Sequence, residues 1–92
     1  MNSDDRRRLF AMLMSADWSD LTPRLLLVAR FCLSQYGRSQ GRHGRTPDQF
    51  VLEAVMDVVE GRYEPQLVRS PFAVIAPRIC YLIRTDAEGK EW

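Results

Sequence analysis

An acidic row, an arginine-rich loop and two cysteines are the features of this sequence that could do chemistry. Glu53, Asp57 and Glu60 stand at i, i+4 and i+7, so a helix would place their carboxylates in one row. We expect the row to be exposed, because Val51 and Val58 give the opposite side of the same segment an apolar character. Such a row is either a solvated helix face or a surface that docks on a basic partner.

The run from Gly37 to Arg45 contains three glycines, three arginines and the only histidine, with no apolar residue. Glycines let a backbone approach phosphate and arginines pair with it, but the loop lacks the Lys-Ser/Thr ending of a Walker-type nucleotide site. His43 has no cysteine, second histidine or carboxylate near it in the sequence, so neither metal binding nor acid–base catalysis is expected there. We expect a solvated loop.

Cys32 and Cys80 are the only cysteines, and each lies within an apolar pattern. Two cysteines provide neither a disulfide framework nor the four ligands of a structural metal site. We therefore expect two buried free thiols and no metal or other cofactor. The sequence also shows no nucleophile with a plausible base and no carboxylate pair with an evident pocket, so we expect a protein that is not an enzyme.

Composition bounds the class of protein. The 92 residues correspond to one domain, and the 46% hydrophobic and 27% charged residues are typical of a globular protein. The chain has neither an apolar run near the roughly 20 residues that span a bilayer nor a secretory signal, so we expect a cytoplasmic protein that does not enter a membrane. Because the net charge is only +1, any contact with nucleic acid must be local.

Helical periodicity dominates the chain. Ser3 before two aspartates is typical of a helix N-terminus, and a short helix is expected after it. A longer helix should begin near Thr22, with Pro23 in its first turn and apolar residues at steps of three and four. Thr46 is a good N-cap for a third helix, which should end near Gly61.

Residues 71–84 leave two structures open. Apolar residues at helical steps fit a helix, whereas the β-branched residues would also fit two short strands. We favour a helix that begins near Pro71 and kinks or restarts at Pro77, because an isolated two-stranded hairpin is marginal. The sequence thus predicts an all-α fold, a small bundle of three to four helices. The residues expected in its core include Trp18, Leu25, Val28, Cys32, Val55 and Ile79.

Residues 17–84 resemble region two of bacterial sigma factors. In the small alternative sigma factors a Leu-rich helix precedes a helix similar to Ala-Glu-Asp-Leu-Val-Gln-Glu-Val-Phe-Leu, and a helix that begins with Phe follows. The likeness is carried by Asp17–Leu26, the glycine and arginine loop, Thr46–Val59, the turn Gly61–Pro65 and Pro71-Phe72. The matching positions are Phe50, Val51, Glu53, Ala54, Val55, Met56, Phe72, Ile75 and Ile79.

The resemblance implies a helical bundle that binds the clamp helices of RNA polymerase and opens promoter DNA. The chain departs from the family at Leu52, where the family has Gln, and at Gln49, where it has Asp. It also has Pro77 within the DNA-reading helix and closes with an acidic stretch, residues 85–92, in place of a basic tail. No second helix-turn-helix domain follows, so upstream promoter recognition is not expected.

Two functions are consistent with these observations. The first is a non-enzymatic, sigma-like single domain that contacts RNA polymerase core and promoter DNA. The second is a stand-alone helical interaction module, an adaptor or small subunit of a larger assembly, which could form a homodimer. The residues expected to contact the protein partner are Glu53, Asp57, Glu60 and Gln49. Those expected to contact nucleic acid are Arg38, Arg42, Arg45, Arg78 and Arg84.

Overall fold

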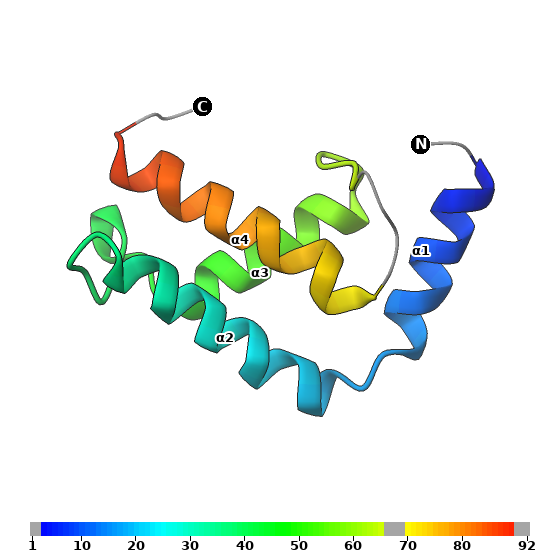
Figure 1. Ribbon diagram of the computed structural model, residues 1–92. Coiled ribbons are helices and arrows are strands. Elements are labelled where there is room, and N and C mark those ends of the chain that lie inside the picture. The colour runs from blue at the N-terminus through cyan, green and yellow to red at the C-terminus, as the bar shows by residue number, and fades with distance from the viewer. Residues whose placement is uncertain (1–2, 66–69, 90–92) are drawn as a thin grey trace.

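The computed structural model describes residues 3–65 and 70–89, and most of these residues are helical (Figure 1). The elements are α1 (Ser3–Ser15), α2 (Trp18–Ser34), the short 3₁₀ helix η1 (Arg42–Gly44), α3 (Pro47–Val59) and α4 (Pro71–Ala87). No strand occurs in these two ranges, so the predicted all-α bundle is confirmed. The last three residues of the acidic stretch, 90–92, lie outside the described residues.

Local sequence signals fix both ends of α3. The Thr46 side chain accepts a hydrogen bond from the Gln49 backbone N–H, and the Gln49 side chain accepts one from the Thr46 backbone N–H at 2.8 Å. This reciprocal capping box satisfies two donors that an open helix end would leave unpaired. Gly61 follows the helix at a φ of +78°, a left-handed conformation that glycine adopts without strain. The predicted bounds of this helix are confirmed.

The second helix begins earlier than the expected Thr22. The Asp17 side chain caps the helix by accepting from the Ser19 N–H at 3.1 Å, and the Trp18 indole N–H donates to the Leu13 carbonyl at 2.9 Å. These bonds anchor an additional turn, which leaves Pro23 inside the helix rather than in its first turn. Because Pro23 has no N–H, the helix loses one hydrogen bond near its N-terminal end. The capping bond of Asp17 stabilises the helix by more than this loss costs.

Residues 71–87 form one helix, so the alternative of two strands is wrong. Ser70 caps α4 by accepting from the Ala73 N–H at 3.1 Å. The helix continues through Pro77 without a restart. Pro77 cannot donate to the Ala73 carbonyl, but both residues are exposed, so water can satisfy that carbonyl.

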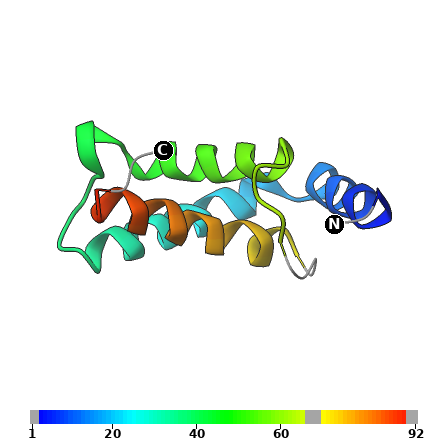
Figure 2. The ribbon, with the colours of Figure 1, turned by 90° about the horizontal axis from the view of Figure 1, so that it is seen from above.

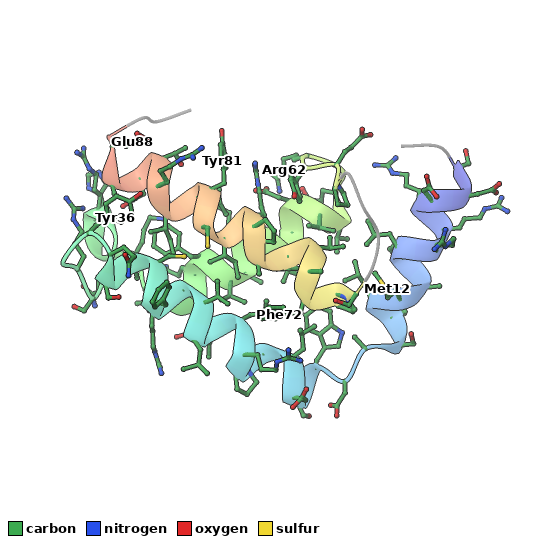
Figure 3. The ribbon with its side chains drawn as sticks, in the orientation of Figure 1. Met12, Tyr36, Arg62, Phe72, Tyr81 and Glu88 are labelled. Carbon is green, nitrogen blue, oxygen red and sulfur yellow. The ribbon has the colours of Figure 1, made fainter. Side chains whose placement is uncertain are left out.

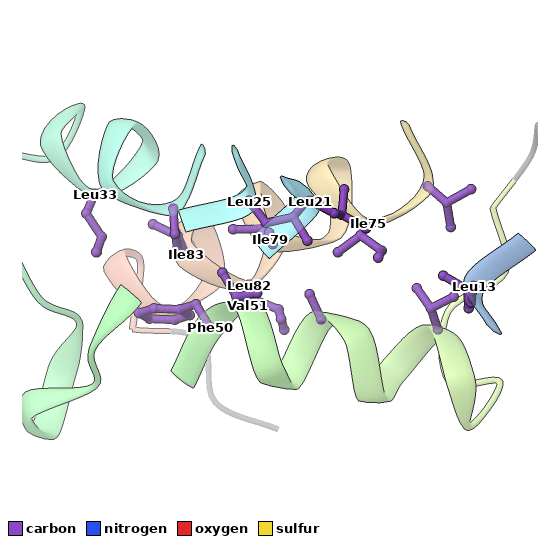
Figure 4. Packing of buried hydrophobic residues seen from close by; sticks show 14 of the residues in the cluster. Leu13, Leu21, Leu25, Leu33, Phe50, Val51, Ile75, Ile79, Leu82 and Ile83 are labelled. Atoms are coloured by element: carbon purple, nitrogen blue, oxygen red, sulfur yellow. The ribbon is translucent and has the colours of Figure 1, made fainter. Parts of the chain in front are cut away.

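Helices α2, α3 and α4 form a three-helix bundle, and α4 packs against both of the others (Figures 1 and 2). Helix α1 lies at one end of this bundle, beside the beginning of α4 (Figure 1). The core runs along the bundle between the three helices (Figure 4). Its fully buried large side chains are Leu25, Leu33, Phe50, Val74, Ile75, Ile79, Leu82 and Ile83.

Of the six residues that the sequence places in the core, two are fully buried and four are only partly buried. Leu25 and Ile79 are fully buried, as expected. The other four predicted residues are only partly buried and pack against the edge of the core: Trp18, Val28, Cys32 and Val55. The buried face of α2 is formed instead by Leu21, Leu25, Ala29 and Leu33. None of the described helices combines the length and the apolar character that crossing a membrane requires.

Candidate protein-binding surface

Asp57 is buried between α3 and α4, and the expectation that it lies in an exposed acidic row is wrong. Asp57 is only 4% exposed. Arg78 Nε lies 2.9 Å from one carboxylate oxygen, and Arg62 Nε lies 3.2 Å from the other. The inward face of α3 is Phe50, Val51, Ala54, Asp57 and Val58, so Asp57 occupies a core-facing position that a charge can tolerate only when paired.

Arg78 is the partner that makes this position possible. It extends from α4, its side chain is 18% exposed, and its guanidinium lies over the rings of Tyr63 and Tyr81 at 5.4 and 4.7 Å. Arg62 and Tyr81 lie on the same side of the molecule (Figure 3) and line one small hollow with Asp57. Both oxygens of the Asp57 carboxylate form ion pairs within the fold, and the pair with Arg78 holds α3 against α4.

Glu53 belongs to a second ionic group, which ties the arginine-rich loop to the bundle. Arg45 pairs with Glu53 and also with Asp86, whose carboxylate lies 3.4 Å away, while its guanidinium stacks on Phe50 at 4.4 Å. The other oxygen of Asp86 accepts from the Arg42 backbone N–H at 2.9 Å. Sequence reasoning missed Asp86, because its partners lie more than 40 positions away in the chain.

The loop is therefore less solvated than expected. A side chain at Gly41 would place its Cβ 2.5 Å from the Phe50 ring and 2.9 Å from an Asp86 oxygen, so only glycine fits this approach. Arg38, Arg42 and His43 remain exposed. Within the described residues, no cluster of three or more His, Cys, Asp or Glu side chains is placed to hold a metal ion.

The remaining predicted contact residues lie apart from one another. Glu60 is exposed and pairs with Arg62 at 2.5 Å, and the Gln49 side chain is used in the capping box. Arg84 is exposed, and its Nε lies 3.9 Å from a carboxylate oxygen of Glu88. The central carbon of its guanidinium lies 5.7 Å from the centre of the Tyr81 ring. The structure does not bring the five predicted nucleic-acid-binding arginines into one patch, because Arg45 and Arg78 serve two separate internal ion-pair groups.

The outward face of α3 is apolar. Leu52, Met56 and Val59, which we call the α3 outer stripe, follow one another at steps of four and three, and they are 63%, 39% and 43% exposed. Single exposed apolar residues are ordinary, but aligned exposed side chains on one helix are typical of a surface that another molecule covers. The stripe could not be recognised from the sequence, because exposed and buried apolar residues on one helix are of the same types.

A groove continues from the stripe toward α1. It has a volume of about 600 Å³, and its apolar lining includes Leu9, Phe10, Leu13 and Val58. Val59 lines the groove as well, so the stripe and the groove are continuous. Exposed charged residues also line it, Arg6 and Arg7 from α1, and Glu60 and Glu64 from the end of α3 and the following turn. An apolar helix face beside an apolar groove can receive an amphipathic helix.

No protein-family model, no curated protein and no solved structure matches the chain.

Proposed function

We propose that this protein is a non-enzymatic helical domain that binds RNA polymerase through the outer face of α3, as a sigma-like domain would. The observation that carries the proposal is the α3 outer stripe, three aligned apolar side chains that the fold leaves exposed. The stripe lies on the helix whose sequence carries most of the resemblance, and Glu53 and Met56 occupy matching positions there.

The ionic groups decide which residues of α3 a partner can reach. Both carboxylate oxygens of Asp57 are already paired with arginines of the same chain. Glu53 is half-buried and paired with Arg45. Leu52 stands where the sigma family has Gln and is 63% exposed. We infer that binding by this chain depends on apolar burial at Leu52 more than on its acidic residues.

Burial of the α3 outer stripe alone does not provide enough free energy for a stable complex. Covering three partly exposed apolar side chains contributes roughly 1 kcal/mol each, whereas association costs about 4–15 kcal/mol in lost freedom. A stable complex must therefore extend into the groove between α1 and α3. A helical partner such as the polymerase clamp helices has the shape to cover both at once.

Contact with promoter DNA would be made by the exposed arginines. Arg38, Arg42 and Arg84 present their side chains to the outside, whereas Arg45 and Arg78 are held by internal carboxylates. We propose that DNA contact adds to polymerase binding rather than replacing it, because three arginines and a net charge of +1 provide little attraction on their own.

The experiment that tests the proposal measures binding of the purified chain to purified RNA polymerase core, with its mass in solution determined in parallel. Saturable binding supports the proposal. If core is not bound and the chain has twice its monomer mass, the second hypothesis, a self-associating module, replaces it. If core is not bound and the chain is monomeric, RNA polymerase is not the partner.

A further inference from the structure

The only two cysteines of the chain lie on two neighbouring helices, α2 and α4. Cys32 on α2 and Cys80 on α4 are separated by almost 50 residues in the sequence, yet both line one hollow where the two helices pack together. Both are half-buried and free. Burial, together with the contact to Cys80, raises the pKa of the Cys32 thiol to about 12, so the thiolate form of Cys32 is disfavoured.

A hollow of about 440 Å³ leads to this pair. Both cysteines line it, together with Tyr36, Tyr81 and Arg84, which are exposed. Helix α4 is continuous here, and Pro77 also lines the hollow. A small reagent can therefore reach the thiols from solution without unfolding of the bundle.

We propose that Cys32 and Cys80 are an oxidation site, at which a small disulfide such as oxidised glutathione converts the two thiols into a disulfide that links α2 to α4. Two thiols and one small disulfide give one protein disulfide and two small thiols, so two electrons and two protons pass from the protein to the reagent. Proximity is what the two residues contribute, because both line one hollow between packed helices, where their side chains can approach each other to form a disulfide.

The reaction has a defined order. Cys80 attacks the small disulfide first, forms a mixed disulfide and releases one small thiol, which takes up the proton of the Cys80 thiol. Cys32 then loses its proton and attacks the Cys80 sulfur, and the second small thiol leaves with that proton. Cys32 serves as the resolving thiol because its own thiolate is disfavoured by burial.

The disulfide would constrain most of the bundle. The loop that it closes runs from residue 32 to residue 80 and contains all of α3. Closing a loop of this length restricts the unfolded chain strongly while the folded helices hardly move. We therefore expect the oxidised protein to melt more than about 5 °C above the reduced protein.

The test treats the folded, reduced chain with oxidised glutathione and measures its intact mass and its melting temperature. Wild type should lose two hydrogen atoms, remain a single chain and melt at the higher temperature, and dithiothreitol should reverse both changes. Cys32→Ser should accumulate a stable glutathione adduct at Cys80, because the resolving thiol is missing. Cys80→Ser should react far more slowly and gain no thermal stability.

Three results would overturn the proposal. The first is a wild type that keeps both thiols, or that carries glutathione without closing the disulfide. The second is a linkage between two chains instead of within one. The third is an oxidised form that melts no higher than the reduced form. The mass of the wild type alone decides between the first outcome and the expected one, even where a serine variant folds poorly.

Discussion

Asp57 and Arg78 join α3 to α4 through an ion pair in which Arg78 Nε lies 2.9 Å from an Asp57 oxygen and the carboxylate side chain is only 5% exposed. Arg62 engages the other oxygen at 3.2 Å. A partner molecule cannot reach this carboxylate without breaking the contact between the two helices. The acidic residue at the centre of the predicted binding row is therefore a part of the fold.

Replacement of Asp57 by Ala should destabilise the protein by about 3–5 kcal/mol, because it leaves the half-enclosed Arg78 charge without its partner. Urea unfolding followed by circular dichroism measures the change. Glu60→Ala is the matched control, since Glu60 is an exposed acid on the same helix end and its pair with Arg62 is worth less than about 1 kcal/mol. Equal stability of Asp57→Ala and Glu60→Ala would contradict the fastening role.

Replacement of Leu25 by Ala should cost about 2–5 kcal/mol, because Leu25 is completely buried where α2 meets α4. Leu27→Ala lies two residues away on the same helix and is 63% exposed, so it should cost less than about 0.5 kcal/mol. Thermal melting of the two variants compares the two faces of α2 directly. If Leu25→Ala melts like Leu27→Ala, α2 is turned the other way.

Stability should also depend on Cys32 in alkaline solution. Burial first, and then the contact with Cys80, raises the pKa of this thiol from its ordinary 9.0 to about 12. The unfolded chain therefore releases the proton before the folded chain does, so the contribution of the neutral thiol is complete below about pH 9 and declines as the pH rises toward 12.

The measurement is the free energy of unfolding across this range under reducing conditions, for wild type and for Cys32→Ser. The difference between the two should change between pH 9 and the highest pH at which the protein stays folded, with wild type losing stability faster. Parallel curves would show that the Cys32 thiol titrates in the folded protein as it does in the unfolded chain.

The parts of the fold that local chemistry determines could be predicted from the sequence. Thr46, Pro47 and Gly61 act on the backbone within a few positions, so the bounds of α3 followed from residue types alone. The sequence predicts a start of α2 that is too late, because Pro23 favours a start near Thr22 whereas the capping bond of Asp17 extends the helix by a turn. Both outcomes rest on contacts within one or two helical turns.

The candidate surface could not be predicted in the same way, because it depends on which face of α3 meets α4. Val51 and Val58 do point inward. Asp57 is buried beside them, because it forms an ion pair with Arg78, which lies 21 positions further along the chain. Leu52, Met56 and Val59 are as apolar as core residues, so nothing in their type marks them as exposed. Residue type predicts burial only on average, and paired charges and binding surfaces are its exceptions.

We propose that the α3 outer stripe binds the protein partner, and a comparison of Leu52→Glu with Leu27→Glu tests this role. Both leucines are 63% exposed in the interior of a helix, on α3 and α2 respectively, so neither change should alter the fold. Affinity for RNA polymerase core is measured for wild type and both variants, with circular dichroism as the control for folding. We predict that Leu52→Glu weakens binding at least about tenfold while Leu27→Glu binds like wild type, because a buried charge without a partner is unfavourable. Equal affinities of the two folded variants would contradict the claim.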